Sequence, residues 1–188
     1  MKVEVRHIEI SRDEDAVRRC LLGDRRAFEE LAGPHLAVAR SLATRLLGNL
    51  EDAQDAVQES LLKAWRGLPG WRPDVPFPAW LLRIVFNQCI DARRRRGTRA
   101  LHEGRAAAPR PERTADLPAQ REALRRVAEA FARLPPRQAA ALHLRVLEEL
   151  DYAAIGTVLG LSAASVRVYV VRARSTLRRL LARDLEGP

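Results

Sequence analysis

The sequence predicts an all-α protein made of two small helical domains joined by a flexible linker. Apolar residues recur at helical spacing along most of the 188 residues, and strand-like alternation is nearly absent. This periodicity lapses over residues 97–118, GTRALHEGRAAAPRPERTADLP, a segment with three prolines and mixed charges. Such a composition is typical of a tether. We therefore expect one domain over residues 13–96 and another over residues 119–183.

Four helices are expected in the first domain. A short helix over residues 13–22 ends at Gly23, and a second begins with Asp24 as its N-cap and stops near Gly48. A third covers residues 51–68. The next ten residues, PGWRPDVPFP, hold four prolines and cannot be helical. A fourth helix follows from residue 79 to about residue 95.

The second domain is expected to end in a helix-turn-helix. Helical patterns cover residues 119–133, 136–147, 151–159 and 162–183. Gly156 removes a side chain where the last two helices cross, and Gly160 supplies the positive φ that ends the first of them. Ser162 can cap the last helix. Two helices joined in this way are typical of DNA-binding domains.

The charge of the chain indicates a polyanionic partner. The net charge is +9 and the isoelectric point is about 10.9. Of the 33 basic residues, 31 are arginines and only Lys2 and Lys63 are lysines. This bias favours contacts to phosphates and bases, but it also fits GC-rich codons. Residues 162–183 carry six arginines and no acidic residue. We interpret this helix as a reader of the DNA major groove, and an ordinary hairpin with a solvated basic face is the alternative.

A second basic site lies where the fourth helix ends in DARRRRG. Four consecutive arginines surround a helix, so at least two face outward, where a phosphate backbone suits them. The proline-rich loop before this helix carries two aromatic rings that can stack on an unpaired base. Burial in the core is the alternative for Trp71 and Phe77. Asn87, on the helix itself, can bond a base edge.

The sequence gives little support to an enzyme, and we expect no catalytic residue, metal or cofactor. The four histidines lack the spacing of a metal site, and no nucleotide-binding or nucleophile motif is present. Asp52, Asp55 and Glu59 have helical spacing, which fits a metal site less well than a solvated or partner-binding face. Cys20 and Cys89 are expected to be buried hydrophobes. We find no signal peptide and no membrane span, and expect a cytoplasmic protein.

Four motifs appear in order, and together they resemble a known family. They are GDRRAFEEL, DAQDAVQESLLKAWRGL, FPAWLLRIVFNQCIDARRRR, and the stretch from LPPRQ to VVRAR that includes the helix-turn-helix. The chain is similar in these motifs, over residues 13–181, to extracytoplasmic-function (ECF) sigma factors, the small sigma-70-type subunits of bacterial RNA polymerase. The resemblance implies sigma region 2 at 13–96, a linker at 97–118 and sigma region 4 at 119–183.

The resemblance also implies roles for particular residues. Those expected to meet the clamp helices of the polymerase β′ subunit are Asp55, Gln58 and Glu59. Those expected at the −10 element, including one flipped base, are Trp71, Arg72, Phe77, Asn87, Arg93 and Arg94. Those expected at the −35 element are Ser165, Arg167, Val168, Tyr169, Arg172, Arg174 and Arg178. Region 4 is further expected to dock on the β flap.

Two positions depart from the family pattern. Val168 and Tyr169 stand where the family commonly has a small or polar residue followed by a basic one. This leaves the −35 motif open, with contacts to thymine methyl groups as an alternative to polar ones. Gly156 is often alanine in the family, and we expect that exchange to be harmless.

The expected function is that of an alternative sigma factor in the bacterial cytoplasm. Its expected partners are core RNA polymerase, promoter DNA and an anti-sigma factor. A tether of about 22 residues reaches about 70 Å when fully extended. Such promoters place the two elements about 16 base pairs, or about 55 Å, apart. A stand-alone helix-turn-helix regulator and an anti-sigma-binding adaptor are the alternatives. Free in solution, the two domains are able to fold together and hide the DNA surfaces.

Overall fold

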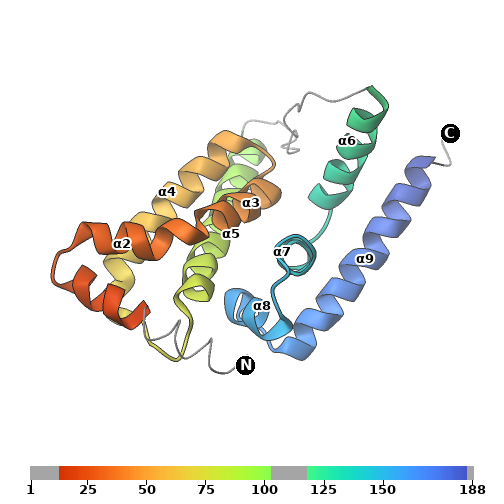
Figure 1. Cartoon of the computed structure of the whole chain (residues 1–188). Coiled ribbons are helices and arrows are strands. Elements are labelled where there is room, and N and C mark those ends of the chain that lie inside the picture. The colour runs from red at the N-terminus through yellow and green to blue at the C-terminus, as the bar shows by residue number, and fades with distance from the viewer. Residues whose placement is uncertain (1–12, 103–117, 186–188) are drawn as a thin grey trace.

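The computed structural model describes residues 13–102 and 118–185, and no strand occurs within them. A first helix covers residues 13–21. The rest of the first domain, where region 2 is expected and which we call region 2, comprises α2 (Arg25–Ala32), the 3-10 helix η1 (Gly33–His35), α3 (Leu36–Leu47), α4 (Leu50–Gly67), the 3-10 helix η2 (Leu68–Gly70) and α5 (Phe77–His102). The second domain, where region 4 is expected and which we call region 4, comprises α6 (Pro118–Ala132), α7 (Pro136–Val146), α8 (Tyr152–Leu159) and α9 (Ala163–Leu185). The two groups of helices lie beside each other in Figure 1, so the all-α, two-domain prediction is confirmed.

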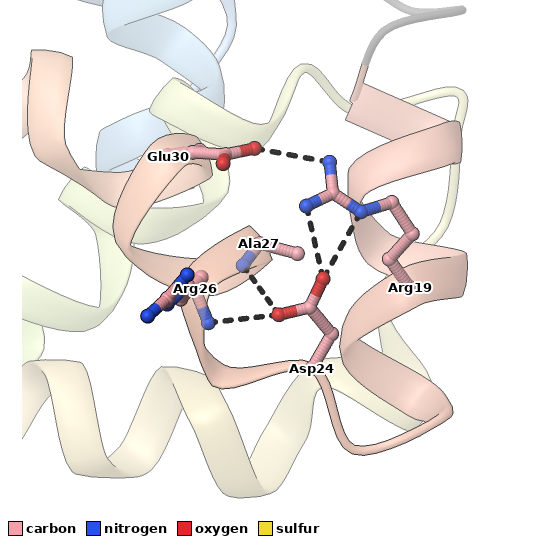
Figure 2. Close-up of polar contacts among 5 residues, drawn as sticks. All are labelled: Arg19, Asp24, Arg26, Ala27 and Glu30. Atoms are coloured by element: carbon pink, nitrogen blue, oxygen red, sulfur yellow. Dashed lines mark hydrogen bonds and ion pairs between the residues drawn. The ribbon is translucent and has the colours of Figure 1, made fainter.

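Asp24 caps α2 as expected. Its Oδ1 accepts hydrogen bonds from the backbone N–H groups of Arg26 and Ala27 at 3.0 and 3.2 Å. Arg19 donates Nε and Nη2 to Asp24 Oδ2 at 3.1 and 2.9 Å, and Nη1 to Glu30 at 3.0 Å, as Figure 2 shows. The hydrogen bonds from Arg19 and then from the backbone lower the pKa of Asp24. This corner ties the first helix to α2.

Several helix boundaries differ from the expected ones, and the proline-rich segment expected to be non-helical contributes its first two residues to η2 and its last two to α5. The helix expected from Asp24 to Gly48 is broken at Gly33–His35, because Pro34 has no N–H to continue the α-helical ladder. The fourth helix does not stop at about residue 95 but runs to His102, six residues into the expected linker. Arginine is a good helix former, so the polar run keeps the helix going without an apolar stripe. Pro118, the last residue of the expected linker, begins α6, and residues 103–117 lie outside the described residues.

A small apolar core closes one end of region 2. It joins the first helix, α2, η2 and α5 through buried residues that include Val17, Leu31, Leu68 and Phe77. The ring of Phe28 meets Trp65 edge-on at 5.3 Å between centroids. Cys20 belongs to this core and Cys89 to the other one, so both cysteines are buried as expected. This packing fixes the loop that precedes α5.

The larger core runs through both domains. Its buried members include Leu42 of α3 and Val85 of α5 from region 2, together with Leu144 of α7 and Ile155 of α8 from region 4. Helix α8 packs against α5, and α7 packs against α3. In Figure 1, α7 and α8 occupy the side of region 4 that faces α3 and α5. The two domains are therefore docked in this structure.

Polar contacts accompany this docking. Ser41 Oγ of α3 lies 3.0 Å from His143 Nε2 of α7. The guanidinium of Arg45 lies over the ring of Phe131 in α6, 4.6 Å from its centroid. His143 is buried. The sequence did not indicate this burial, because the residues around His143 come from both domains.

Candidate nucleic-acid interface

The helix-turn-helix has the expected local geometry. Helices α8 and α9 meet at an angle of 93°, within the range usual for this motif. Asp151 caps α8 by accepting a hydrogen bond from Ala154 N at 2.7 Å, and Gly160 ends it with φ at +65°. Ser162 Oγ accepts from Ser165 N at 3.2 Å, which caps α9. The predicted turn is confirmed at both ends.

Gly156 is less tolerant than the sequence suggested. A Cβ at this position would lie 2.6 Å from the carbonyl oxygen of Leu161. That oxygen belongs to the backbone of the turn, so it cannot swing aside as a flexible side chain can. The close crossing was predicted correctly, whereas the expectation that alanine is harmless here was wrong.

One face of α9 is buried and the other carries arginines. Val166, Val170 and Ala173 are buried against the core. Exposed on the other side are Arg167, Val168, Arg172, Arg174 and Arg178. Tyr169 is half-buried against the core, and Ser165 is half-buried within the cap. The structure therefore brings the expected basic residues together on an exposed surface, which we call the α9 arginine face.

Arg167 is positioned by an aromatic ring of α8. Its guanidinium lies 5.1 Å from the centroid of Tyr152, and that of Arg145 lies at the same distance from the same ring. Cation–π contacts at exposed sites contribute about 0.5–1 kcal/mol. Tyr152 was not among the expected site residues, because no local sequence pattern indicates which ring an arginine will stack on.

The candidate −10 residues fall into two groups. Asn87, Arg72 and Arg94 are exposed, and Arg72 Nε lies 3.3 Å from Asp74. Phe77 is fully buried and Trp71 is 8% exposed, with its Nε1 donating to Val75 O at 3.0 Å. In this structure neither ring offers a face to a base. The structure therefore places both rings in the core, which was the alternative to a stacking surface.

The arginine run at residues 93–96 is also divided. Arg93 Nη1 donates to the carbonyl of Leu46 at 2.8 Å, and Arg96 Nη1 donates to that of Leu47 at 3.2 Å. These carbonyls close α3, so the two arginines satisfy its otherwise unpaired acceptors. Arg93 thus has a structural partner. Arg94 and Arg95 are exposed.

An acidic face lies on α4, which belongs to the other domain from the α9 arginine face. Asp55, Gln58 and Glu59 are all exposed there. Beside them, a groove of about 290 Å³ between α4 and α5 is lined by Asp52, Asp55, Glu59, Gln88, Arg95 and Arg96. Asp52 is already paired with Arg96. We call Asp55, Gln58 and Glu59 the α4 acidic face.

Two further residues support this face. Gln88 of α5, which is 3% exposed, donates Nε2 to Glu59 Oε2 at 2.9 Å. Lys63 donates to the side-chain oxygen of the same amide. Sequence reasoning missed both, because the contacts join residues that are 25 and 29 positions apart and no local spacing marks them.

The described residues show little that would hold a metal or react chemically. Among residues 13–102 and 118–185, no group of three or more His, Cys, Asp or Glu is arranged to hold a metal ion. Burial raises the pKa of Cys89 to about 12, so its thiol stays protonated. In the same part of the chain, no single helix is long and apolar enough to span a membrane.

Comparison with known proteins agrees with the geometry. Residues 19–99 match the family model of Sigma-70 region 2, and residues 124–177 match that of Sigma-70, region 4. The chain is 34% identical over 169 residues to the ECF RNA polymerase sigma factor SigM of Mycobacterium tuberculosis, covering 90% of this chain and 84% of SigM. It is 33% identical over 178 residues to the RNA polymerase sigma factor CnrH of Cupriavidus metallidurans, covering 87% and 91%.

Two solved structures share the fold. CnrH in complex with the cytosolic domain of CnrY superposes with a TM-score of 0.66 at 30% identity, over 92% of this chain and 99% of that one. The sigma factor RpoE of Bartonella quintana, in complex with the anti-sigma factor NepR, superposes with a TM-score of 0.66 at 25% identity, over 82% and 96%. The chain therefore belongs to the ECF sigma factors of the sigma-70 family, and it is an alternative sigma factor that directs transcription initiation.

Proposed function

We propose that the α4 acidic face binds the clamp helices of the core polymerase β′ subunit while region 4 docks on the β flap. The observation that carries this assignment is the segregation of charge on a protein of net charge +9. Asp55 and Glu59 are exposed together on α4, whereas residues 162–183, which form most of α9, carry six arginines and no acidic residue. An acidic surface on a DNA-binding protein repels phosphates, which favours a protein partner for it.

Region 2 is proposed to read the −10 element through Asn87, with Arg72 and Arg94 on the phosphates. Asn87 is exposed on α5 and presents an amide that can bond a base edge. Arg72 is exposed on the loop before α5, and Arg94 is exposed in the C-terminal half of α5. Trp71 and Phe77 support this surface from within the core, so we assign them no direct base contact.

Region 4 is proposed to read the −35 element through the α9 arginine face. Residues near the start of a recognition helix reach base edges, and those farther along meet phosphates. Arg167 and Val168 lie in the first turns of α9, whereas Arg174 and Arg178 lie beyond them. Val168 is 45% exposed, so it can contact a thymine methyl group.

The docked domains must separate for this function. The two promoter elements lie about 55 Å apart, whereas α8 of region 4 packs directly on α5 of region 2. Residues 103–117 between α5 and α6 span at most about 55 Å when fully extended. Asn87 and the α9 arginine face remain exposed in the docked form. Docking therefore holds Asn87 and the α9 arginine face at one spacing, and it does not cover either of them.

The setting of this activity follows from the same assignment. The polymerase supplies the chemistry of transcription, so the chain needs no catalytic residue or cofactor of its own. The chain acts in the bacterial cytoplasm, where promoter and polymerase meet. The CnrH and RpoE structures were solved with CnrY and with the anti-sigma factor NepR. We propose that an anti-sigma factor likewise controls this chain.

The polymerase contact is tested by reversing one charge. Glu59→Arg is expected to weaken binding to core polymerase, measured by titration with labelled full-length protein. The matched control is Glu51→Arg, which makes the same change at an exposed position in the first turn of α4. Binding of the full-length protein to a −35 duplex should not fall with either variant. Equal core affinity for Glu59→Arg and wild type would remove the α4 acidic face from the interface.

A further inference from the structure

Gln88 is buried among charged groups although its own side chain is neutral. It is 3% exposed on α5, and its amide reaches two residues of α4. Nε2 donates to Glu59 Oε2 at 2.9 Å, and Oε1 accepts a hydrogen bond from Lys63 Nζ. Hydrogen bonds to charged partners are stronger than those between neutral groups. Both ends of the amide are therefore engaged.

This amide determines where the carboxylate of Glu59 lies. Glu59 and Lys63 are one turn apart on α4, a spacing at which glutamate and lysine pair directly with each other. Here the Gln88 amide lies between them and bonds each one. The Glu59 carboxylate is thereby held against α5, where it lines the groove with Asp55.

Without Gln88, the Glu59 side chain has little to hold it. Glu59 is exposed, and its side chain has several rotamers in water. A binding partner then bears the entropy cost of ordering it, whereas a carboxylate that is already fixed avoids that cost. The bond from Gln88 supplies this order in the free protein.

We infer that Gln88 is a positioning residue for polymerase binding, acting through Glu59. The inference rests on the proposed role of Glu59 at the polymerase interface. At 3% exposure Gln88 has almost no surface with which to touch a partner, so its effect must pass through the residues it bonds. It also ties the α4 acidic face to the turn of α5 that carries Asn87.

The test replaces Gln88 by methionine in the full-length protein. Methionine has a similar length and suits a buried site, but it makes neither hydrogen bond. We expect the affinity for core polymerase to fall about five- to tenfold. Lys63→Met is the matched control, because it breaks the other bond of the amide and leaves the one to Glu59. It should change the affinity by less than about threefold.

A double-mutant cycle separates positioning from general packing. Glu59→Gln should lower the affinity by itself, and Gln88→Met should add less than about twofold in that background. If the affinity loss of the double variant equals the product of the two single losses, Gln88 acts independently of Glu59 and the inference is overturned. Should Gln88→Met fail to fold, Gln88→Glu gives the same test. It keeps a partner for Lys63 but repels Glu59, so it should also weaken binding.

The outcomes distinguish this inference from the proposed function. If Glu59→Arg weakens core binding and Gln88→Met does not, Gln88 has no positioning role while the α4 acidic face keeps its partner. If Glu59→Arg binds core as the wild type does, the assignment of the face fails and the inference fails with it.

Discussion

Ser41 Oγ and His143 Nε2 lie 3.0 Å apart although 102 residues separate them in the chain. This pair joins α3 of region 2 to α7 of region 4, and His143 is 2% exposed. Burial and then the nearby Arg45 lower the pKa of His143 to about 4, while Glu148, 3.3 Å from Nε2, opposes the shift. The docked form therefore holds a neutral imidazole.

The docking of the two domains should weaken as the pH falls from 7 to 5. His143 has its ordinary pKa near 6.5 when the domains are apart, and a pKa of about 4 when they are docked. Below about pH 6.5 the open form binds a proton that the docked form does not. This linkage costs about 2 kcal/mol of docking free energy at pH 5. Spin labels at exposed positions 66 on α4 and 179 on α9 should report a longer distance at pH 5 than at pH 7.

The control for this measurement is His143→Gln. Glutamine can still bond Ser41 but does not titrate in this range, so its interspin distance should not change between pH 7 and pH 5. If the variant opens over the same pH range as the wild type, other groups govern the docking and our account of His143 is wrong.

Gly156→Ala should destabilise the protein, by about 1–3 kcal/mol as is typical of overpacked sites. The added Cβ meets the Leu161 carbonyl oxygen at 2.6 Å, so the turn of the helix-turn-helix must move. Gly33→Ala is the matched control, because Gly33 has open space around it and an ordinary helical φ of −48°. Urea unfolding should show the loss only for Gly156→Ala, and equal stabilities for the two variants would contradict the close crossing.

Asn87→Ala should slow promoter opening and relax the preference at one position of the −10 element. Loss of one base contact costs about 1–3 kcal/mol of discrimination. The side chain is exposed, so its removal should leave the thermal stability of the protein unchanged. Permanganate footprinting on −10 variants measures both the rate of promoter opening and the base preference. Footprints and base preferences equal to those of the wild type would leave Asn87 without a reading role.

Arg167→Ala and Arg178→Ala should have different signatures. Arg167 lies near the start of α9 and is supported by the Tyr152 ring, so its loss should cost about 1–3 kcal/mol at one or two −35 positions. Arg178→Ala should weaken binding to all sequences, and it should reduce the slope of the logarithm of the binding constant against the logarithm of salt concentration by about one. Fluorescence anisotropy of the full-length protein on −35 duplexes at several salt concentrations distinguishes them. Sequence-independent losses from both variants would mean that α9 only holds the DNA backbone.

Features determined by neighbouring residues were predictable from the sequence. The N-caps at Asp24 and Ser162 and the left-handed end of α8 at Gly160 depend on a few residues each, and all were predicted correctly. The exposed arginines of α9 also followed from helical spacing, because the apolar residues of the same helix define its buried side.

Features that depend on distant partners were not predictable in this way. The burial of His143 depends on a partner 102 residues away, and that of Phe77 depends in part on the ring of Phe28 in α2. An aromatic residue in a proline-rich loop has the same local pattern whether it is packed or exposed. Likewise, the helix end at His102 was missed, because a polar helix of arginines has no apolar periodicity to mark its extent.

The central claim is that this chain gives core polymerase its promoter specificity. Run-off transcription with purified core polymerase, the full-length protein and a panel of templates that vary the −10 and −35 elements tests it most directly. We predict a discrete transcript that requires both proteins and both elements, and that is lost with Glu59→Arg. A protein that binds −35 duplexes yet yields no specific transcript with core polymerase would contradict the claim.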